Sequence, residues 1–142
     1  MRKSSKIVVA APLSTCYRLA YTWALDPRRH STYRDVFPGR TYSGRIIFEE
    51  PNSRFIIREG DIDSLTKMTG LSGWSVTYDF RKHESGGTEV EISVDYGVGL
   101  AVLSIGTASV QASNEIIHRV TALLALQDGI AEGQKANTQP SS

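Results

Sequence analysis

Polar and apolar residues alternate strictly along two neighbouring stretches of the chain, which predicts two β-strands. A period of two with one apolar face is typical of strands that are buried on one side only. The pair Gly86–Gly87 between the stretches predicts a hairpin. If Phe80 pairs with Val90, then Arg81 falls opposite Glu89, a favourable charge pair on the polar face. The apolar positions are Trp74, Val76, Tyr78 and Phe80 in the first stretch and Val90, Ile92, Val94 and Tyr96 in the second.

Strand-like patterns also occur earlier in the chain. In the segment 41–49, Tyr42, Ile46 and Phe48 share one face. In the next segment, 54–62, isoleucines fall on both faces, so the pattern does not decide which face is buried. Residues 64–73 are polar and contain two glycines, which predicts a bulged or irregular edge. The three predicted strands are residues 4–11, 41–49 and 54–62.

Helical spacing predicts two short helices after the first strand. Pro12 can open the first of them, over residues 13–23, because its fixed backbone angle suits a helix start. Asp26 can cap the second, over residues 27–35, because its carboxylate accepts the free first-turn N–H groups.

A long helix with a broad apolar arc is predicted near the end of the chain. It begins near residue 107 and runs to residue 127 or beyond, with Gly129 and Gly133 as candidate ends. Glu115 and His118 fall on the opposite side, which predicts that they face water. The arc comprises Val110, Ser113, Ile116, Ile117, Val120, Leu123, Leu124 and Gln127.

The order of these elements favours an α+β fold. An antiparallel sheet buries one face, and the long amphipathic helix can cover it. We therefore expect a curved antiparallel sheet gripping a long C-terminal helix, with two short helices after strand one. At 142 residues the length fits one domain. We assign residues 1–134 to it and expect a disordered tail over residues 135–142.

With this element order, the chain resembles the helix-grip, START-like (SRPBCC) superfamily of polyketide cyclases and lipid-transfer domains. The resemblance covers residues 4–134. It rests on Ala11–Pro12 after the first strand, Leu25–Pro27 at the second helix, and Gly86–Thr88 within the hairpin. It implies a cavity between sheet and helix that holds an apolar small molecule.

The candidate cavity-lining residues lie on the apolar strand faces and on the helix arc. Aromatic side chains with a hydroxyl or N–H group suit such a site, although ordinary core packing would explain each of them alone. Ser113 is polar within the arc, so it either contacts a ligand or bonds to backbone or water. The candidates are Tyr42, Phe48, Phe55, Trp74, Val76, Tyr78, Phe80, Ile92, Val94, Tyr96, Ser113, Ile117, Val120 and Leu124.

Composition excludes several other classes of protein. The 16 Lys and Arg against 15 Asp and Glu argue against a nucleic-acid-binding surface over the whole domain. Cys16 is the only cysteine, so disulfides within the chain and multi-cysteine zinc sites are excluded. We expect Cys16 to be a buried apolar residue. A single cysteine also fits a cytoplasmic protein, which is the location we expect. The three histidines do not cluster, so no metal or cofactor is expected. The uncharged run 96–114 contains three glycines and is not expected to cross a membrane.

The sequence leaves three functions open. The leading prediction is binding or transport of a lipid, isoprenoid or aromatic polyketide. The second is a cyclase, aromatase or dehydratase acting in the same cavity. It needs a titratable group inside, and the apolar faces of the hairpin supply none, so no catalytic residue is assigned. The third is an interaction module that makes transient contact with a protein or membrane through the sheet edge or the basic residues of 28–40. The acidic residues expected at wet strand ends are Glu49, Glu50, Glu59, Asp61 and Asp63.

Overall fold

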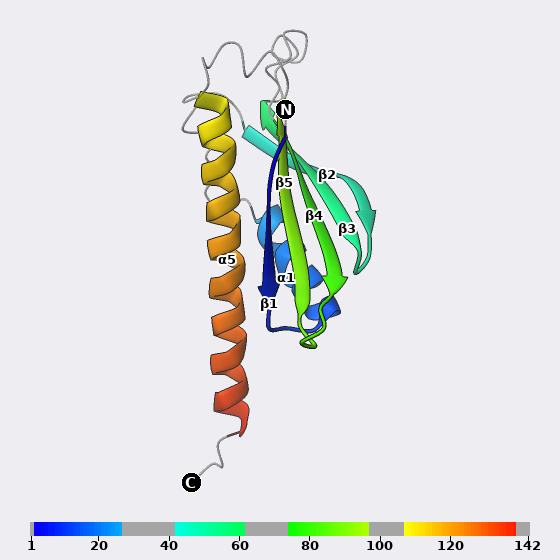
Figure 1. Ribbon diagram of the computed structural model, residues 1–142, viewed down its shortest axis with the longest axis vertical. Helices are drawn as coiled ribbons and strands as arrows, with labels where there is room; N and C mark the ends of the chain where they lie inside the picture. The colour runs from blue at the N-terminus through cyan, green and yellow to red at the C-terminus, as the bar shows by residue number, and fades with distance from the viewer. Residues whose placement is uncertain (1, 27–41, 62–73, 97–106, 139–142) are drawn as a thin grey trace.

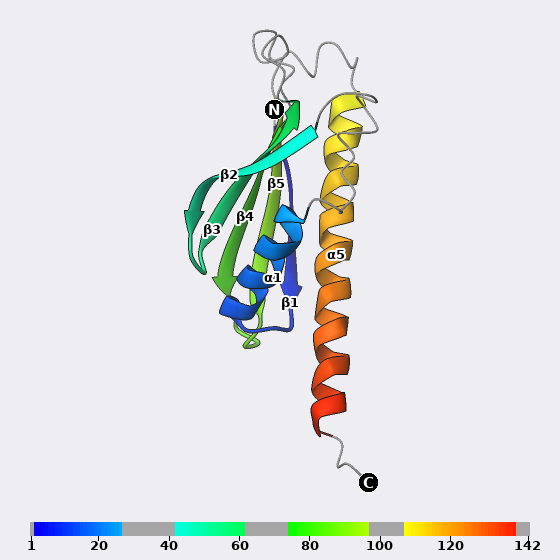
Figure 2. The same cartoon turned by 180° about the vertical axis from the view of Figure 1, so that it is seen from behind.

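In the part of the chain that the structure describes, two helices lie on one face of a five-stranded antiparallel sheet (Figures 1 and 2). The computed structural model describes residues 2–26, 42–61, 74–96 and 107–138. The strand order is β1-β5-β4-β3-β2. The elements are β1 (Arg2–Val9), α1 (Leu13–Leu25), β2 (Tyr42–Glu50), β3 (Arg54–Asp61), β4 (Trp74–Lys82), β5 (Thr88–Tyr96) and α5 (Thr107–Thr138). The α+β class and the sheet with its C-terminal helix are thereby confirmed.

The central hairpin has the register that the alternating pattern predicts. Phe80 pairs with Val90, Tyr78 with Ile92, and Arg81 with Glu89. Burial along β4 alternates in step with the sequence, and Val76, Val90 and Ile92 are completely buried. The apolar face of the hairpin is therefore the inner face of the sheet, on the side of both helices.

A β-bulge in β2 reverses the facing of its last residues. The pairing steps from Ile46 opposite Ile57 to Phe48 opposite Ile56, which leaves Ile47 as an extra residue. A residue added to one strand moves every later side chain to the other face. The prediction that Phe48 shares a face with Ile46 is therefore wrong. Phe48 lies on the outer face and is 44% exposed.

Helix α1 packs its small and aromatic residues against the inner face of the sheet. Figure 2 shows α1 crossing that face, with α5 running alongside. The buried residues Cys16, Tyr17, Ala20 and Ala24 recur at helical spacing. The small alanines let the helix approach closely, while the Tyr17 ring packs against Phe55 and Phe80. Cys16 is 2% exposed, as expected for a buried apolar residue.

The turn between β4 and β5 is fastened to the end of β1. Gly86 has a positive φ of 88°, which favours glycine. At Gly87 a Cβ atom would lie 2.5 Å from the carbonyl oxygen of Val9, so only glycine fits. The Thr88 hydroxyl donates a hydrogen bond of 2.8 Å to the carbonyl oxygen of Ala11. Two of the segments that carry the superfamily resemblance thus meet in space.

Helix α5 is longer than expected and presents a different face to the sheet. It continues through Gly129 and Gly133 to Thr138, so the expected end at either glycine is wrong. Its buried positions include Ala112, Ile116 and Leu123. Glu115, expected to face water, is also fully buried. Three predicted arc residues, Val110, Ile117 and Leu124, are instead 58%, 62% and 41% exposed.

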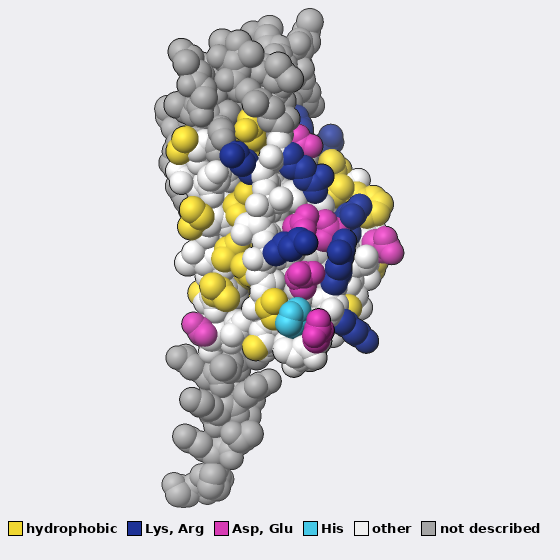
Figure 3. Space-filling model, in the orientation of Figure 1, with side chains coloured by type: hydrophobic (Ala, Val, Ile, Leu, Met, Phe, Trp, Pro, Cys, Tyr) yellow, Lys and Arg dark blue, Asp and Glu magenta, His cyan; other side chains and the backbone are white. Residues whose placement is uncertain are grey.

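The outer face of the sheet carries a lattice of charged and polar side chains, as the alternation predicts. Figure 3 shows basic and acidic groups interspersed over the strands. Arg54 donates to Asp79 at 2.5 Å, and Lys6 lies 3.5 Å from Glu91. The outer face is therefore exposed to solvent, whereas the inner face is apolar.

Three expectations fall on parts of the chain outside the described residues. These are the second short helix over 27–35, the irregular edge over 64–73 and the basic residues of 28–40. Within the described part, one helix follows strand one. None of the described helices is long and apolar enough to cross a membrane.

Candidate functional site: a buried charged cluster

Three charged side chains lie completely buried between the sheet and α5. Arg119 and Glu115 come from α5, and Glu59 comes from β3. The Arg119 Nε atom donates to Glu115 Oε1 at 2.8 Å, and its Nη2 atom donates to Glu59 Oε1 at 2.5 Å. Its Nη1 atom donates to the Tyr78 hydroxyl at 2.8 Å. The guanidinium therefore binds a neighbour through each of its three nitrogens.

Two tryptophans enclose this cluster. Trp74 Nε1 donates to Glu59 Oε2 at 3.2 Å, so both oxygens of that carboxylate accept a hydrogen bond. The guanidinium carbon of Arg119 lies 5.5 Å from the Trp23 ring centre and 5.7 Å from that of Tyr78, within the range of a cation–π contact. The charged groups are thus surrounded by aromatic rings instead of water.

Local geometry explains how each charged group reaches the inner face. Glu59 is two residues after Ile57 in β3, so the strand period places both on the same side. Glu115 and Arg119 are four residues apart on α5, so their side chains meet on one helix face. Opposite Glu59, the first residue of β4 is Trp74. We call Glu59, Tyr78, Glu115 and Arg119 the polar cluster.

Burying such a cluster is costly unless the geometry is good. Desolvation of two opposite charges can exceed their mutual attraction, and an apolar set of similar volume is often equally stable. The polar cluster is therefore poor evidence for stability alone. Chemically it provides two carboxylates, a hydroxyl and a guanidinium, groups that can orient a polar atom of a ligand or transfer a proton.

A second set of polar groups lies between α1 and β2. The Tyr21 hydroxyl donates to Glu49 Oε2 at 2.7 Å, and this hydrogen bond, with burial, raises the pKa of Tyr21. Burial and then the Glu49 charge raise the pKa of Tyr17. Among the described residues, the buried Tyr17 hydroxyl has no hydrogen-bond partner. The bulge at Ile47 turns Glu49 inward, towards these tyrosines.

An aromatic layer connects the two polar sets. The Phe55 ring stacks on Tyr78 with centres 4.5 Å apart, and the Tyr17 ring meets Phe55 edge-on at 5.6 Å. Phe80 lies 5.1 Å from Tyr17. These rings form an apolar surface. Tyr78 joins it to the polar cluster, and Tyr17 joins it to the polar groups between α1 and β2.

The predicted lining residues fall into three groups in the structure. Eight are buried on the inner face, Ser113 and Val120 are half-buried on α5, and Phe48, Ile117 and Leu124 are exposed. Tyr42 lies in β2 opposite Asp61, and its side chain is outside the described part. Contact of any of these residues with a ligand stays a prediction. The eight buried residues are Phe55, Trp74, Val76, Tyr78, Phe80, Ile92, Val94 and Tyr96.

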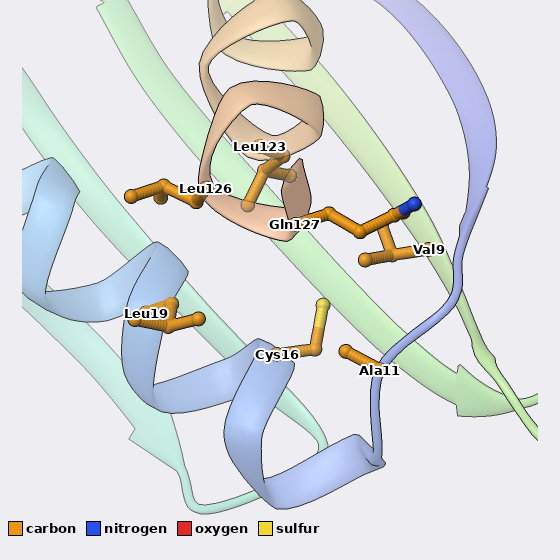
Figure 4. A pocket seen from close by; sticks show the side chains of 7 residues that line it. All are labelled: Val9, Ala11, Cys16, Leu19, Leu123, Leu126 and Gln127. Carbon is orange, nitrogen blue, oxygen red and sulfur yellow. The ribbon is translucent and has the colours of Figure 1, made fainter. Parts of the chain in front are cut away.

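A small pocket lies next to Cys16, in the N-terminal half of α1. Figure 4 shows the Cys16 sulfur pointing into it, between Ala11 and Leu123. Its volume of about 10 Å³ is close to that of a single water molecule. Gln127 closes one side, and its Oε1 atom accepts a hydrogen bond of 3.0 Å from the Ala10 backbone N–H. A backbone bond, the alternative to ligand contact, thus accounts for this polar residue of the arc.

Sequence reasoning missed the charged members of the polar cluster. Glu59 was expected at a wet strand end, and Glu115 was expected to face water. Both expectations are wrong, since the two carboxylates are fully buried. The usable signals were the position of Glu59 two residues after Ile57, and the Glu115–Arg119 spacing on the helix. In the described part of the chain, no three His, Cys, Asp or Glu side chains are grouped to hold a metal ion.

Comparison with known proteins identifies the fold. No protein-family model matches the chain, and no curated protein matches it significantly. Among solved structures, DR_A0006 from Deinococcus radiodurans is 13% identical, with a TM-score of 0.54 over 89% of this chain and 96% of that one. CV1439 from Chromobacterium violaceum is 14% identical, with a TM-score of 0.52 over 88% and 96% of the two chains.

A third similar structure is StfQ, a di-domain ARO/CYC protein from the steffimycin biosynthetic pathway. It is 12% identical, with a TM-score of 0.52 over 92% of this chain and 51% of StfQ. The chain thus spans about half of that protein. At these identities the likeness concerns the fold alone, and the chain shares the helix-grip fold of these structures.

Proposed function

We propose that the chain binds an apolar small molecule between the inner face of the sheet and α5. The observation that carries the proposal is the polar cluster, set into a face that is otherwise apolar and aromatic. Such a combination of broad apolar walls and a few convergent polar groups is typical of small-molecule sites. A lipid, an isoprenoid or an aromatic polyketide fits this surface, with one polar end directed at the cluster.

Movement of α5 away from the sheet would open space for a ligand. The described pocket admits about one water, so it is too small for such a molecule. The contact of α5 with the sheet includes Ala112 and the charged pair Glu115 and Arg119, besides Ile116 and Leu123. A ligand with a polar end can replace part of the hydrogen bonding that holds the helix in place.

Ligand binding can be tested by native mass spectrometry and by displacement of anilinonaphthalene sulfonate. A fatty acid, an isoprenoid alcohol and a hydroxyanthraquinone would serve as competitors. We expect saturable displacement by at least one of them, and weaker displacement in Tyr78→Phe, which loses the hydroxyl bonded to Arg119. The matched control is Tyr96→Phe, on the same inner face but outside the polar cluster. The proposal is contradicted if the protein carries no small molecule and none of the three competitors displaces the probe.

The polar cluster also favours a second candidate, an enzyme of the cyclase or dehydratase type. The apolar face of the hairpin supplies no Asp, Glu or His, but the neighbouring β3 supplies Glu59 and α5 supplies Glu115. These carboxylates meet the requirement for a titratable group inside. StfQ, with the same fold, is an ARO/CYC protein of a biosynthetic pathway. We expect Glu59→Gln to keep ligand affinity and to abolish conversion of a linear β-polyketone. Equal conversion by both proteins would exclude Glu59 as the acid or base.

A further inference from the structure

Between Thr107 and Gln127, helix α5 has its charged residues inside and three of its large aliphatic residues outside. Between Thr107 and Gln127 its only Asp, Glu, Lys or Arg residues are Glu115 and Arg119, and both are fully buried. Val110, Ile117 and Leu124 are 58%, 62% and 41% exposed. A solvated helix normally has the opposite arrangement. Figure 3 shows hydrophobic side chains along α5 on the face towards the viewer.

The three aliphatic residues recur every seven positions, which makes them one straight line on the helix. Paired helices use two positions of each seven-residue repeat, a and d. Val110, Ile117 and Leu124 fill the d position here, and the uncharged Asn114 and Thr121 fill the a position. The other exposed residues alongside are Asn114, Thr121 and Ala125, all uncharged. We call the line formed by Val110, Ile117 and Leu124, with these neighbours, the outer strip of α5. Contiguous apolar surface on a folded domain is a candidate contact site when it extends over a few hundred Å².

We propose that the outer strip of α5 is the surface through which two copies of this chain associate. In a two-fold contact the same patch meets itself, so any charge in it would meet its own copy. The outer strip has no charge to oppose this. A membrane-binding helix would instead have Lys or Arg along the edges of its apolar face, and the exposed part of α5 up to Gln127 has none.

The size of the strip sets the strength of the contact. Val110 to Leu124 spans about 21 Å at 1.5 Å per residue, and with a helix width of about 10 Å this gives roughly 200 Å² per copy. The whole of α5, with 32 residues, would give about 500 Å². Figure 1 shows its C-terminal turns running past the end of the sheet, where a second helix can reach them. A stable pair buries about 800 Å² per partner, so we expect a dimer that dissociates on dilution.

The test is sedimentation velocity from low to high micromolar concentration. We expect the wild type to dimerise as concentration rises, and Ile117→Glu to remain monomeric with an unchanged circular dichroism spectrum. An equal mixture of Ile117→Glu and Ile117→Lys should restore the dimer. The matched control is Ile47→Glu, because Ile47 is 51% exposed but lies in the β2 bulge. Ile47→Glu should dimerise like the wild type.

A disulfide experiment covers the case in which Ile117→Glu does not fold. Ile117 can meet its own copy in a parallel or an antiparallel pair, so Ile117→Cys should cross-link under mild oxidation at concentrations where the wild type dimerises. Cys16 will not compete, because it is 2% exposed. The proposal is overturned by a wild type that stays monomeric throughout, by an unlinked Ile117→Cys or by a dimeric Ile117→Glu. Ile117-dependent binding of monomers to phosphatidylcholine–phosphatidylserine vesicles would overturn it in favour of a membrane surface. Because the outer strip and the inner face are separate, loss of dimerisation leaves the ligand proposal intact.

Discussion

Removal of Arg119 should destabilise the fold more than any other single charge deletion in the described structure. The variant Arg119→Met keeps the length and the apolar stem of the side chain but deletes the guanidinium. Glu59 and Glu115 then stay buried without the donors that now hold them at 2.5 and 2.8 Å. Tyr78 loses a donor as well.

The expected loss follows from the cost of a buried charge left behind. Removing one partner of a buried ion pair costs about 3–5 kcal/mol. The total free energy of unfolding of a domain is about 5–15 kcal/mol, so this is a large fraction of it. In urea, with a slope of about 2 kcal/mol per molar, the midpoint should fall by roughly 2 M. The slope itself should not change, because the surface exposed on unfolding stays the same.

The outer face of the sheet supplies a matched control in Arg54→Met. Arg54 pairs with Asp79, but its side chain is 48% exposed, and such pairs contribute less than about 1 kcal/mol. Combining Arg119→Met with Glu59→Met and Glu115→Leu should restore most of the lost stability, since no charge is then left buried. If Arg119→Met costs no more than Arg54→Met, the reasoning about the polar cluster is wrong.

Three further substitutions or reactions test separate features of the packing. Tyr17→Phe should raise the free energy of unfolding by about 1 kcal/mol, because it deletes a buried hydroxyl that has no hydrogen-bond partner among the described residues. Destabilisation in urea would mean that water binds this hydroxyl. Burial raises the pKa of the Cys16 thiol to about 11, so Ellman's reagent at pH 8 should label the folded protein only at the rate of opening, and fast labelling would contradict the packing. Gly87→Ala should cost about 1–3 kcal/mol by thermal unfolding, because its Cβ would press on the Val9 carbonyl. Gly129→Ala, in a helix with open space around it, should cost nothing, and equal effects of the two variants would exclude that clash.

Local pattern was sufficient to predict the central hairpin. Both its strands alternate, its turn has two glycines, and the charge pair Arg81–Glu89 supports the same register from the outer face. Three independent local signals therefore predict the same register without any distant contact. The order of elements then gave the helix-grip fold, because the inner face needs an apolar cover.

The facing of β2 could not be predicted because a bulge leaves no strong mark in its sequence. Residues 46–48 are Ile, Ile and Phe, so the apolar run is equally compatible with either parity. The pairing of Glu49 with Phe55 and the contact of Glu49 with Tyr21 depend on residues distant in the sequence. Only the assembled sheet decides which of the two faces each residue takes.

The face that α5 turns towards the sheet is the clearest case in which contacts with distant residues outweigh the apolar pattern of the helix itself. Counting apolar residues favours a helix that buries Ile117 and Leu124, yet that rotation would carry Glu115 and Arg119 away from Glu59 and Tyr78. Glu59 would then be a buried carboxylate without its guanidinium, at a cost of about 3–5 kcal/mol. Full burial of two aliphatic side chains gives at most about 1.5–3 kcal/mol each, and less where each is already partly covered. The two rotations are therefore close in free energy. The Arg119–Glu59 contact selects one of them, and the unused aliphatic residues become the outer strip.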